Sequence, residues 1–182
     1  MSLKTSPSHH YHGSDGVYAE ARGDGGLNLY WGESKIFKNA TDAIRECLES
    51  LAPFLIQPDG ADAAREQDIL LVNEFANFTD QRLVNGLKRF LDRDDRSSLL
   101  TKHCGIALTG FDSTGYATPD GQSTADAILA AIRTELSNWI QSVERRIHEE
   151  KLISFDVHFI CIPMPSANDF RSYFLQILGL KE

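Results

Sequence analysis

The stretch from Leu27 to Phe37, with the sequence Leu-Asn-Leu-Tyr-Trp-Gly-Glu-Ser-Lys-Ile-Phe, most constrains how this chain can fold. Aromatic and aliphatic residues recur at every second position, which predicts a β-strand with one buried face. Because side chains alternate across a strand, Trp31, Glu33 and Lys35 share that face. A charge buried beside aromatic rings is costly unless it is paired, hydrogen-bonded or bound to a metal. The Glu-x-Lys pair is therefore a candidate functional site.

A second short strand at residues 16–21 precedes this stretch, and the Gly-rich segment 22–26 joins the two. This spacing predicts an antiparallel hairpin. If the residues that flank the loop pair with each other, the apolar residues of both strands face one another and Asp15 falls opposite Glu33. Directly opposed Cβ atoms lie about 5 Å apart, so the two carboxylates repel unless a cation lies between them. We expect Asp15, Glu33 and Lys35 to form one cluster at the edge of the hairpin.

A structural explanation of the same residues stays open. With 26 acidic residues in the chain, an acid-x-Lys tripeptide is expected to arise by chance, and a second one, Glu149-Glu150-Lys151, occurs in a charged helical segment. The tripeptide alone is therefore a weak signal, and the strand, its apolar face and the opposing Asp15 carry the interpretation. The alternative is an edge strand that a salt bridge stabilises.

Composition and length indicate one globular domain, because 182 residues suffice for one sizeable core. No apolar run reaches the ~18 residues of a membrane span, and no secretory signal opens the sequence. Three widely spaced cysteines without a Cys-x-x-Cys motif argue against a disulfide framework and a zinc ribbon. We expect a cytoplasmic protein without a membrane partner.

The net charge of −8 argues against strong, independent binding to nucleic acid, because proteins that bind through their own field are usually basic. It does not exclude a nuclease. Metal ions can offset local acidic charge, and another subunit can hold the substrate.

The remaining pattern predicts helices and strands in alternation after the hairpin. The expected order is a helix at about 39–56, a helical insertion at about 57–100, a strand at 103–111, a long helix at about 124–151, a strand at 153–164 and a final helix at about 166–178. This order predicts an α/β (α+β) fold with a mixed β-sheet flanked by helices. Residues 1–8 are expected to be disordered or vector-derived, and residues 9–182 to form a single domain.

Histidines add weaker signals. Three of them fall within residues 9–12 and could ligate a transition metal, although histidines near a chain end more often face solvent. His12, three residues before Asp15, is the one expected to touch the cluster. His103 and His158 are predicted to be hydrogen-bonded strand residues rather than ligands.

The order of these motifs resembles the PD-(D/E)xK nuclease superfamily: an Asp at a strand start, a Glu-x-Lys about twenty residues later on the paired strand, then a helix and another strand. More narrowly, His-Gly-Ser-Asp-Gly-Val-Tyr and Leu-Tyr-Trp-Gly-Glu-Ser-Lys resemble the HamA family, the nuclease subunits of Hachiman antiphage defence systems. The superfamily resemblance covers about residues 12–56, and the HamA resemblance most of the chain. The superfamily resemblance implies a restriction-endonuclease-like core.

The resemblance also implies metal-dependent hydrolysis of phosphodiester bonds in DNA, controlled by a helicase subunit. Asp15 and Glu33 would hold Mg²⁺ or Mn²⁺, with the Ser34 carbonyl as a further ligand. Lys35 would orient the attacking water or stabilise developing charge. One departure is that the superfamily core begins with a helix before the hairpin, so either that helix is missing or this chain is the C-terminal part of a longer protein.

Two other functional classes fit the same residues. One is a non-catalytic protein-interaction domain in which the Asp/Glu/Lys cluster is structural. The other is an effector that is active only with a helicase or ATPase partner. The choice between DNA and RNA, the strandedness of the substrate and a possible homo-oligomer stay open.

Overall fold

The computed structural model describes residues 14–56, 80–91, 101–116 and 124–179. In chain order its elements are β1 (Gly16–Ala21), β2 (Leu27–Phe37), α1 (Ala40–Ile56), α3 (Gln81–Leu91), β3 (Thr101–Asp112), a 3-10 turn (Thr114–Tyr116), α4 (Ala125–Glu149), β4 (Asp156–Met164) and α5 (Ala167–Ile177). Of the predicted insertion, only α3 falls in the described ranges. The predicted disordered start and the histidines at 9–12 lie outside them.

The four strands of the described chain form one mixed sheet in the order β1-β2-β3-β4. β1 and β2 are antiparallel, whereas β2–β3 and β3–β4 are parallel. Val17 pairs with Trp31 and Ala21 with Leu27, which is the register that the apolar pattern predicts. The predicted α/β fold with a mixed sheet is thereby confirmed.

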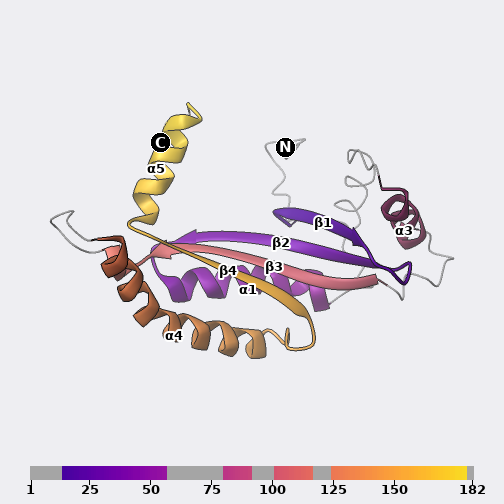
Figure 1. Ribbon diagram of the computed structural model, residues 1–182, viewed down its shortest axis with the longest axis horizontal. Helices are drawn as coiled ribbons and strands as arrows, with labels where there is room; N and C mark the ends of the chain where they lie inside the picture. Colours follow the sequence, from indigo (N-terminus) through magenta and orange to yellow (C-terminus); the bar gives the residue numbers. More distant parts are fainter. Residues whose placement is uncertain (1–13, 57–79, 92–100, 117–123, 180–182) are drawn as a thin grey trace.

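Both long helices, α1 and α4, lie against the same face of the sheet (Figure 1). The chain crosses from β2 to β3 through α1, and from β3 to β4 through α4, moving in the same direction across the sheet each time. Because crossovers between parallel strands are right-handed, two crossovers in one direction place their helices on one side. The buried core therefore forms between this face and the two helices.

α1 begins directly after β2 and carries most of this core. The Asn39 side chain accepts a hydrogen bond from the backbone N–H of Thr41 at 2.8 Å, which satisfies a free donor at the start of the helix. Pro53 lies inside the helix, where proline can cause a kink or an earlier end, but the helix continues to Ile56. Its apolar stripe is fully buried (Ile44, Leu48, Leu51, Leu55).

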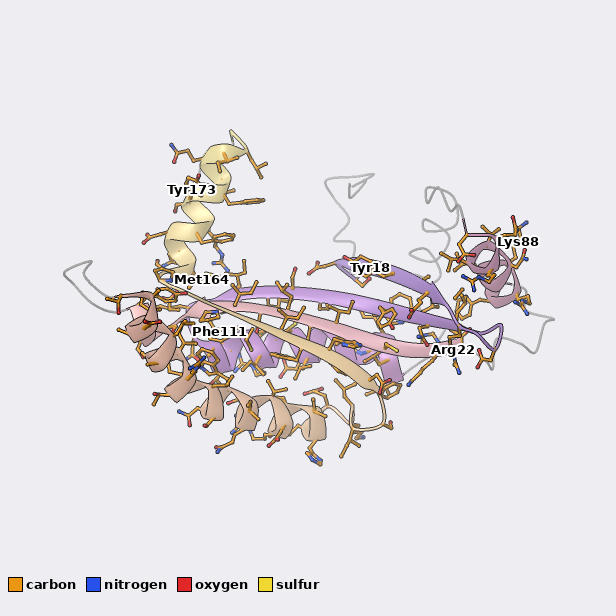
Figure 2. The ribbon with its side chains drawn as sticks, viewed as in Figure 1. Tyr18, Arg22, Lys88, Phe111, Met164 and Tyr173 are labelled. Carbon is orange, nitrogen blue, oxygen red and sulfur yellow. The ribbon has the colours of Figure 1, made fainter. Side chains whose placement is uncertain are left out.

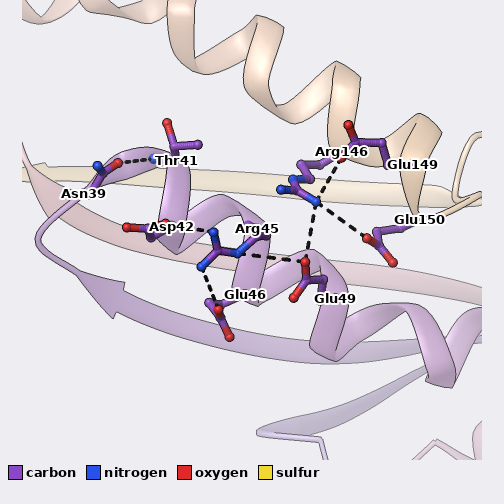
Figure 3. A network of polar contacts seen from close by, with 9 residues as sticks. All are labelled: Asn39, Thr41, Asp42, Arg45, Glu46, Glu49, Arg146, Glu149 and Glu150. Atoms are coloured by element: carbon purple, nitrogen blue, oxygen red, sulfur yellow. Dashed lines mark hydrogen bonds and ion pairs between the residues drawn. The ribbon is translucent and has the colours of Figure 1, made fainter.

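Arg146 joins α4 to α1. Its guanidinium lies 3.5 Å from Glu49 of α1 and also contacts Glu149 and Glu150 of its own helix (Figure 3). The large apolar residues of α4 are only partly buried. Trp139 packs edge-on against Phe111 with ring centroids 4.8 Å apart, whereas Leu136 and Ile140 are 44% and 48% exposed.

α5 leaves the sheet at the end of β4 and rises on the side opposite α1 and α4 (Figure 1). The Ser166 side chain caps it by accepting from the N–H of Asp169 at 3.1 Å. Its base is tied to the sheet by a hydrogen bond from the Arg171 guanidinium to the carbonyl oxygen of Ile36.

Candidate functional site

The hairpin positions Asp15 at the end of the β1–β2 ladder. The last paired residues are Gly16 and Gly32, and the N–H of Asp15 extends the pairing by donating to the Gly32 carbonyl at 2.9 Å. This contact keeps Asp15 at the edge of the hairpin, next to Glu33, although the paired register itself ends one residue earlier, at Gly16 and Gly32. Asp15 is exposed to solvent. The hairpin therefore presents one exposed and one buried carboxylate at the same edge.

Glu33 is almost completely buried, with only 5% of its side chain exposed. Its Oε2 atom accepts a hydrogen bond from the Nζ of Lys35 at 2.9 Å. Burial raises the pKa of Glu33 above its ordinary value; the hydrogen bond and charge of Lys35 oppose this shift, and the charge of Asp15 adds to it. The charges of both Lys35 and Asp15 thus change the pKa of Glu33, and the three residues form one electrostatic cluster.

Lys35 is more accessible, with 28% of its side chain exposed. Burial by itself lowers its pKa, but the hydrogen bond to Glu33 and the charges of Glu33 and Asp15 outweigh that effect, so the net shift is upward. Lys35 therefore carries its positive charge throughout the neutral pH range.

Ser34 holds the Asp15 carboxylate in place. Its backbone N–H and its hydroxyl both donate to Asp15 Oδ2, at 2.8 Å and 2.7 Å. The sequence assigns Ser34 a role only through its carbonyl, and these two donors are an additional finding. Both bonds converge on one oxygen of Asp15.

Cys47 of α1 supports the cluster from below. Its thiol donates to the backbone carbonyl of Glu33, with Sγ and O 3.4 Å apart. Burial, followed by the charge of Glu33, raises the pKa of Cys47 to about 12, so the thiol stays protonated. Sequence reasoning missed this residue; the only available signal is its position on the apolar stripe of the helix that follows Glu-x-Lys.

The HamA family model matches residues 1–178. The chain belongs to the HamA family. This finding confirms the family resemblance drawn from the two motifs and makes the chain a member of the family that serves Hachiman antiphage defence systems. No curated protein and no solved structure is significantly similar to it.

The cluster of this HamA-family chain offers few side-chain ligands, and these are carboxylate oxygens. Within the described ranges, no three His, Cys, Asp or Glu side chains converge on a point that could hold a metal ion. Asp15 and Glu33 supply two carboxylates. Mg²⁺ in phosphoryl-transfer sites is held by one or two carboxylates, with waters and substrate phosphates completing its shell. The donor set therefore matches Mg²⁺ or Mn²⁺ better than a transition metal that requires imidazole or thiolate.

Trp31 and His103 lie beside the cluster on the same sheet face, whereas Tyr30 and His158 lie on the opposite face. The indole N–H of Trp31 donates to Nδ1 of His103 at 3.1 Å, so the prediction of a hydrogen-bonded strand histidine is confirmed for His103. His158 is exposed, with its ring 5.9 Å from that of Tyr30. Neither histidine belongs to the carboxylate cluster.

The cluster is separate from the two cavities described below. A cavity of about 620 Å³ lies at the C-terminal ends of β2 and β3, between Phe37, Asp42 and Asp112, and a smaller one lies beside α3. None of the cluster residues lines either cavity. None of the helices in the described part of the chain is long and apolar enough to span a membrane.

Proposed function

We propose that this HamA-family chain is a Mg²⁺- or Mn²⁺-dependent nuclease of the PD-(D/E)xK type. It cleaves phosphodiester bonds in DNA as the effector of Hachiman defence, under the control of a helicase partner. The observation that carries the proposal is the ion pair between buried Glu33 and Lys35, whose Oε2 and Nζ atoms lie 2.9 Å apart, with the charge of exposed Asp15 acting on Glu33. Family membership supports the defence role.

Asp15 and Glu33 have complementary tasks in this proposal. Ser34 occupies Oδ2 of Asp15, so Oδ1 would remain to hold a cation. Burial raises the pKa of Glu33 and so disfavours its ionised form. A cation in addition to Lys35 would therefore stabilise the Glu33 carboxylate. The Ser34 carbonyl is a further oxygen ligand. A bound Mg²⁺ or Mn²⁺ supplies an acidified water and offsets charge on the reacting phosphate.

Lys35 acts as a fixed cation rather than as a base. Its raised pKa keeps the amine protonated at neutral pH, so it cannot accept a proton from water in this geometry. A protonated amine beside Glu33 can orient the attacking water and stabilise the negative charge that develops on phosphate.

A structural role for the cluster is the competing interpretation, and one observation favours it. The Glu33–Lys35 ion pair is complete without any ligand, as expected for a strand in a non-catalytic interaction domain. That interpretation predicts that the chain binds no divalent cation at Glu33.

The test combines cation binding with cleavage. Mn²⁺ titration by calorimetry and cleavage of linear and supercoiled DNA are measured on wild type and on the Asp15→Ala, Glu33→Ala and Lys35→Ala variants, with and without the helicase subunit. The matched controls are Glu149→Ala and Lys151→Ala, which alter the chain's other acid-x-Lys tripeptide on the surface of α4 and just beyond it.

We expect wild type and both controls to bind Mn²⁺ and to cleave DNA in at least one of the two settings. Each of the three cluster variants should lose cleavage. Asp15→Ala and Glu33→Ala should keep a thermal midpoint within a few degrees of wild type, and Lys35→Ala should still unfold in a cooperative transition. Cleavage at the wild-type rate in folded Glu33→Ala would refute the assignment. Absence of Mn²⁺ binding and of cleavage, both with and without the helicase, would favour the interaction domain.

A further inference from the structure

Arginine side chains gather at the end of the sheet away from Asp15, in a protein whose net charge is −8. A cavity of about 180 Å³ opens there between the β1–β2 loop and α3. Its charged lining consists of Arg22 from the loop and of Arg82 and Arg89 from the helix, and among the described residues that line it none is acidic. Figure 2 shows Arg22 and Lys88, which mark the loop and the helix, at this end of the molecule.

The walls of this cavity, which we call the arginine cleft, are held together by apolar packing. Leu27 and Leu29 of β2 form a buried cluster with Leu87 of α3. The helix approaches so closely at Gly86 that an added Cβ would lie 2.6 Å from the Cδ2 of Leu27. The cleft is therefore a built feature of the fold rather than a chance gap between side chains.

The loop that forms the other wall is fixed by its own hydrogen bonds. The N–H of Arg22 donates to the Gly26 carbonyl at 2.9 Å, and the N–H of Gly26 donates to the Asp24 side chain at 3.0 Å. Gly25 adopts a φ of +83°, which L side chains rarely tolerate. The Arg89 guanidinium spans the cleft by donating to the Gly25 carbonyl at 3.0 Å.

Two of the three charges of the cleft are oriented by acidic partners that do not line it. Asp24 holds Arg22 at 2.6 Å, and Asp80 holds Arg82 at 3.2 Å. The described contacts of Arg89 are to the carbonyl oxygens of Asn85 and Gly25, which leave its positive charge in place. A guanidinium has five N–H donors in a planar fork that matches phosphate oxygens, and the described bonds of Arg82 and Arg89 engage two nitrogens of each, so both side chains retain donors for an anion. The Asn85 amide completes the polar lining.

We propose that the arginine cleft binds a backbone phosphate of the nucleic acid that the hairpin edge cleaves. The cleft volume of about 180 Å³ is more than ten times the ~10–15 Å³ that a cavity needs to hold one water molecule, so the cleft has room for a phosphate group. β1 separates Arg22 from Asp15 by seven residues, or about 23 Å at ~3.3 Å per residue. At ~3.4 Å per base pair, that distance corresponds to about seven base pairs of duplex between the held phosphate and the reacting one.

This inference rests on the proposed nuclease function for the identity of its ligand, but its test does not require cleavage. Binding of a fluorescent DNA duplex is measured by anisotropy in EDTA, on wild type, Arg82→Gln and Lys88→Gln, with the helicase subunit present if wild type alone does not bind. Lys88 is exposed on the same helix and does not line the cleft, so its variant removes the same charge outside the site. Arg82 is 80% exposed, and its replacement should leave the fold intact.

Arg82→Gln should weaken duplex binding about tenfold, as expected for one lost charge-assisted hydrogen bond, whereas Lys88→Gln should change it less than about twofold. The slope of log affinity against log salt concentration should fall by about one in Arg82→Gln alone. Equal losses in both variants would show a general field effect and overturn the proposal, as would unchanged binding in Arg82→Gln. A wild type that binds no duplex in either setting would overturn it too.

Inorganic phosphate distinguishes the two sources of the same anion. If phosphate binds wild type but not Arg82→Gln while duplex affinity is equal in both, the cleft takes a small phosphate and not a nucleic acid. The readout is also separable from the proposed function. If cleavage depends on Glu33 but all variants bind duplex equally, only the proposed phosphate site in the arginine cleft is refuted. If no cleavage is found but Arg82→Gln loses duplex binding, only the proposed phosphate site is supported.

Discussion

Replacing Lys35 with methionine should destabilise the fold by leaving the Glu33 carboxylate buried without its partner. Breaking a buried ion pair from one side costs about 3–5 kcal/mol, and because 28% of the Lys35 side chain is exposed to water we expect the lower end, about 3 kcal/mol at neutral pH. For a chain of this length, that loss lowers the thermal midpoint by about 6–12 °C.

The cost of Lys35→Met should depend on pH in a defined direction. Burial raises the pKa of Glu33 in the folded state, and removing Lys35 removes the main influence that opposes this rise. A carboxyl group with a raised folded pKa contributes stability that is present below its unfolded pKa and is lost as pH rises through the folded pKa. The free energy of unfolding of the variant should therefore fall relative to wild type as pH rises above about 4.5.

Urea unfolding in EDTA across the acidic and neutral range measures this effect, and the double variant Glu33→Gln/Lys35→Met supplies the control. With both charges removed, the free energy of unfolding should return to within about 1 kcal/mol of wild type at neutral pH. The double variant should nevertheless be unable to cleave DNA. A cost of Lys35→Met that is independent of pH, or that persists in the double variant, would refute the buried-charge reasoning and indicate lost packing instead.

Three further outcomes follow from the geometry around the cluster. Ser34→Ala removes one of the two hydrogen bonds to Asp15 and should weaken Mn²⁺ binding about fivefold without changing the thermal midpoint. Ser34→Thr should retain the wild-type affinity for Mn²⁺, and equal affinities of Ser34→Ala and wild type in calorimetry would contradict this prediction. Cys47, with a pKa of about 12, should resist iodoacetamide at about pH 8 until the chain unfolds, so labelling of folded protein would disprove its burial. Trp31→Phe removes the bond to His103 and part of a fully buried ring, and should lower the free energy of unfolding by about 1–3 kcal/mol; an unchanged urea midpoint would argue against this contact.

Local pattern was sufficient to predict the hairpin and its register. The alternation from Leu27 to Phe37 and the Gly-rich turn fix which residues face each other, because a slip of one residue would turn every apolar side chain outward. The same alternation places Glu33 and Lys35 on one face, and the structure confirms that they touch. The strands and helices downstream follow the predicted order, with described boundaries within three residues of the expected ones.

The sequence could not show how deeply Glu33 is buried. That depth depends on α1 packing over β2, which brings Cys47 to within 3.4 Å of the Glu33 carbonyl. The two hydrogen bonds from Ser34 to Asp15 also depend on three-dimensional geometry, since strand periodicity alone places their side chains on opposite faces.

By itself, then, the sequence determined the elements of this protein, the pairing of its hairpin and the family to which it belongs. Those features follow from periodicity, turn residues and motifs, which act between near neighbours in the chain. Only the tertiary structure decided that α1 and α4 share one face, that Leu136 and Ile140 of α4 stay exposed, and that the β1–β2 loop and α3 enclose the arginine cleft. These depend on the handedness of crossovers and on packing between segments far apart in sequence, which no local pattern encodes.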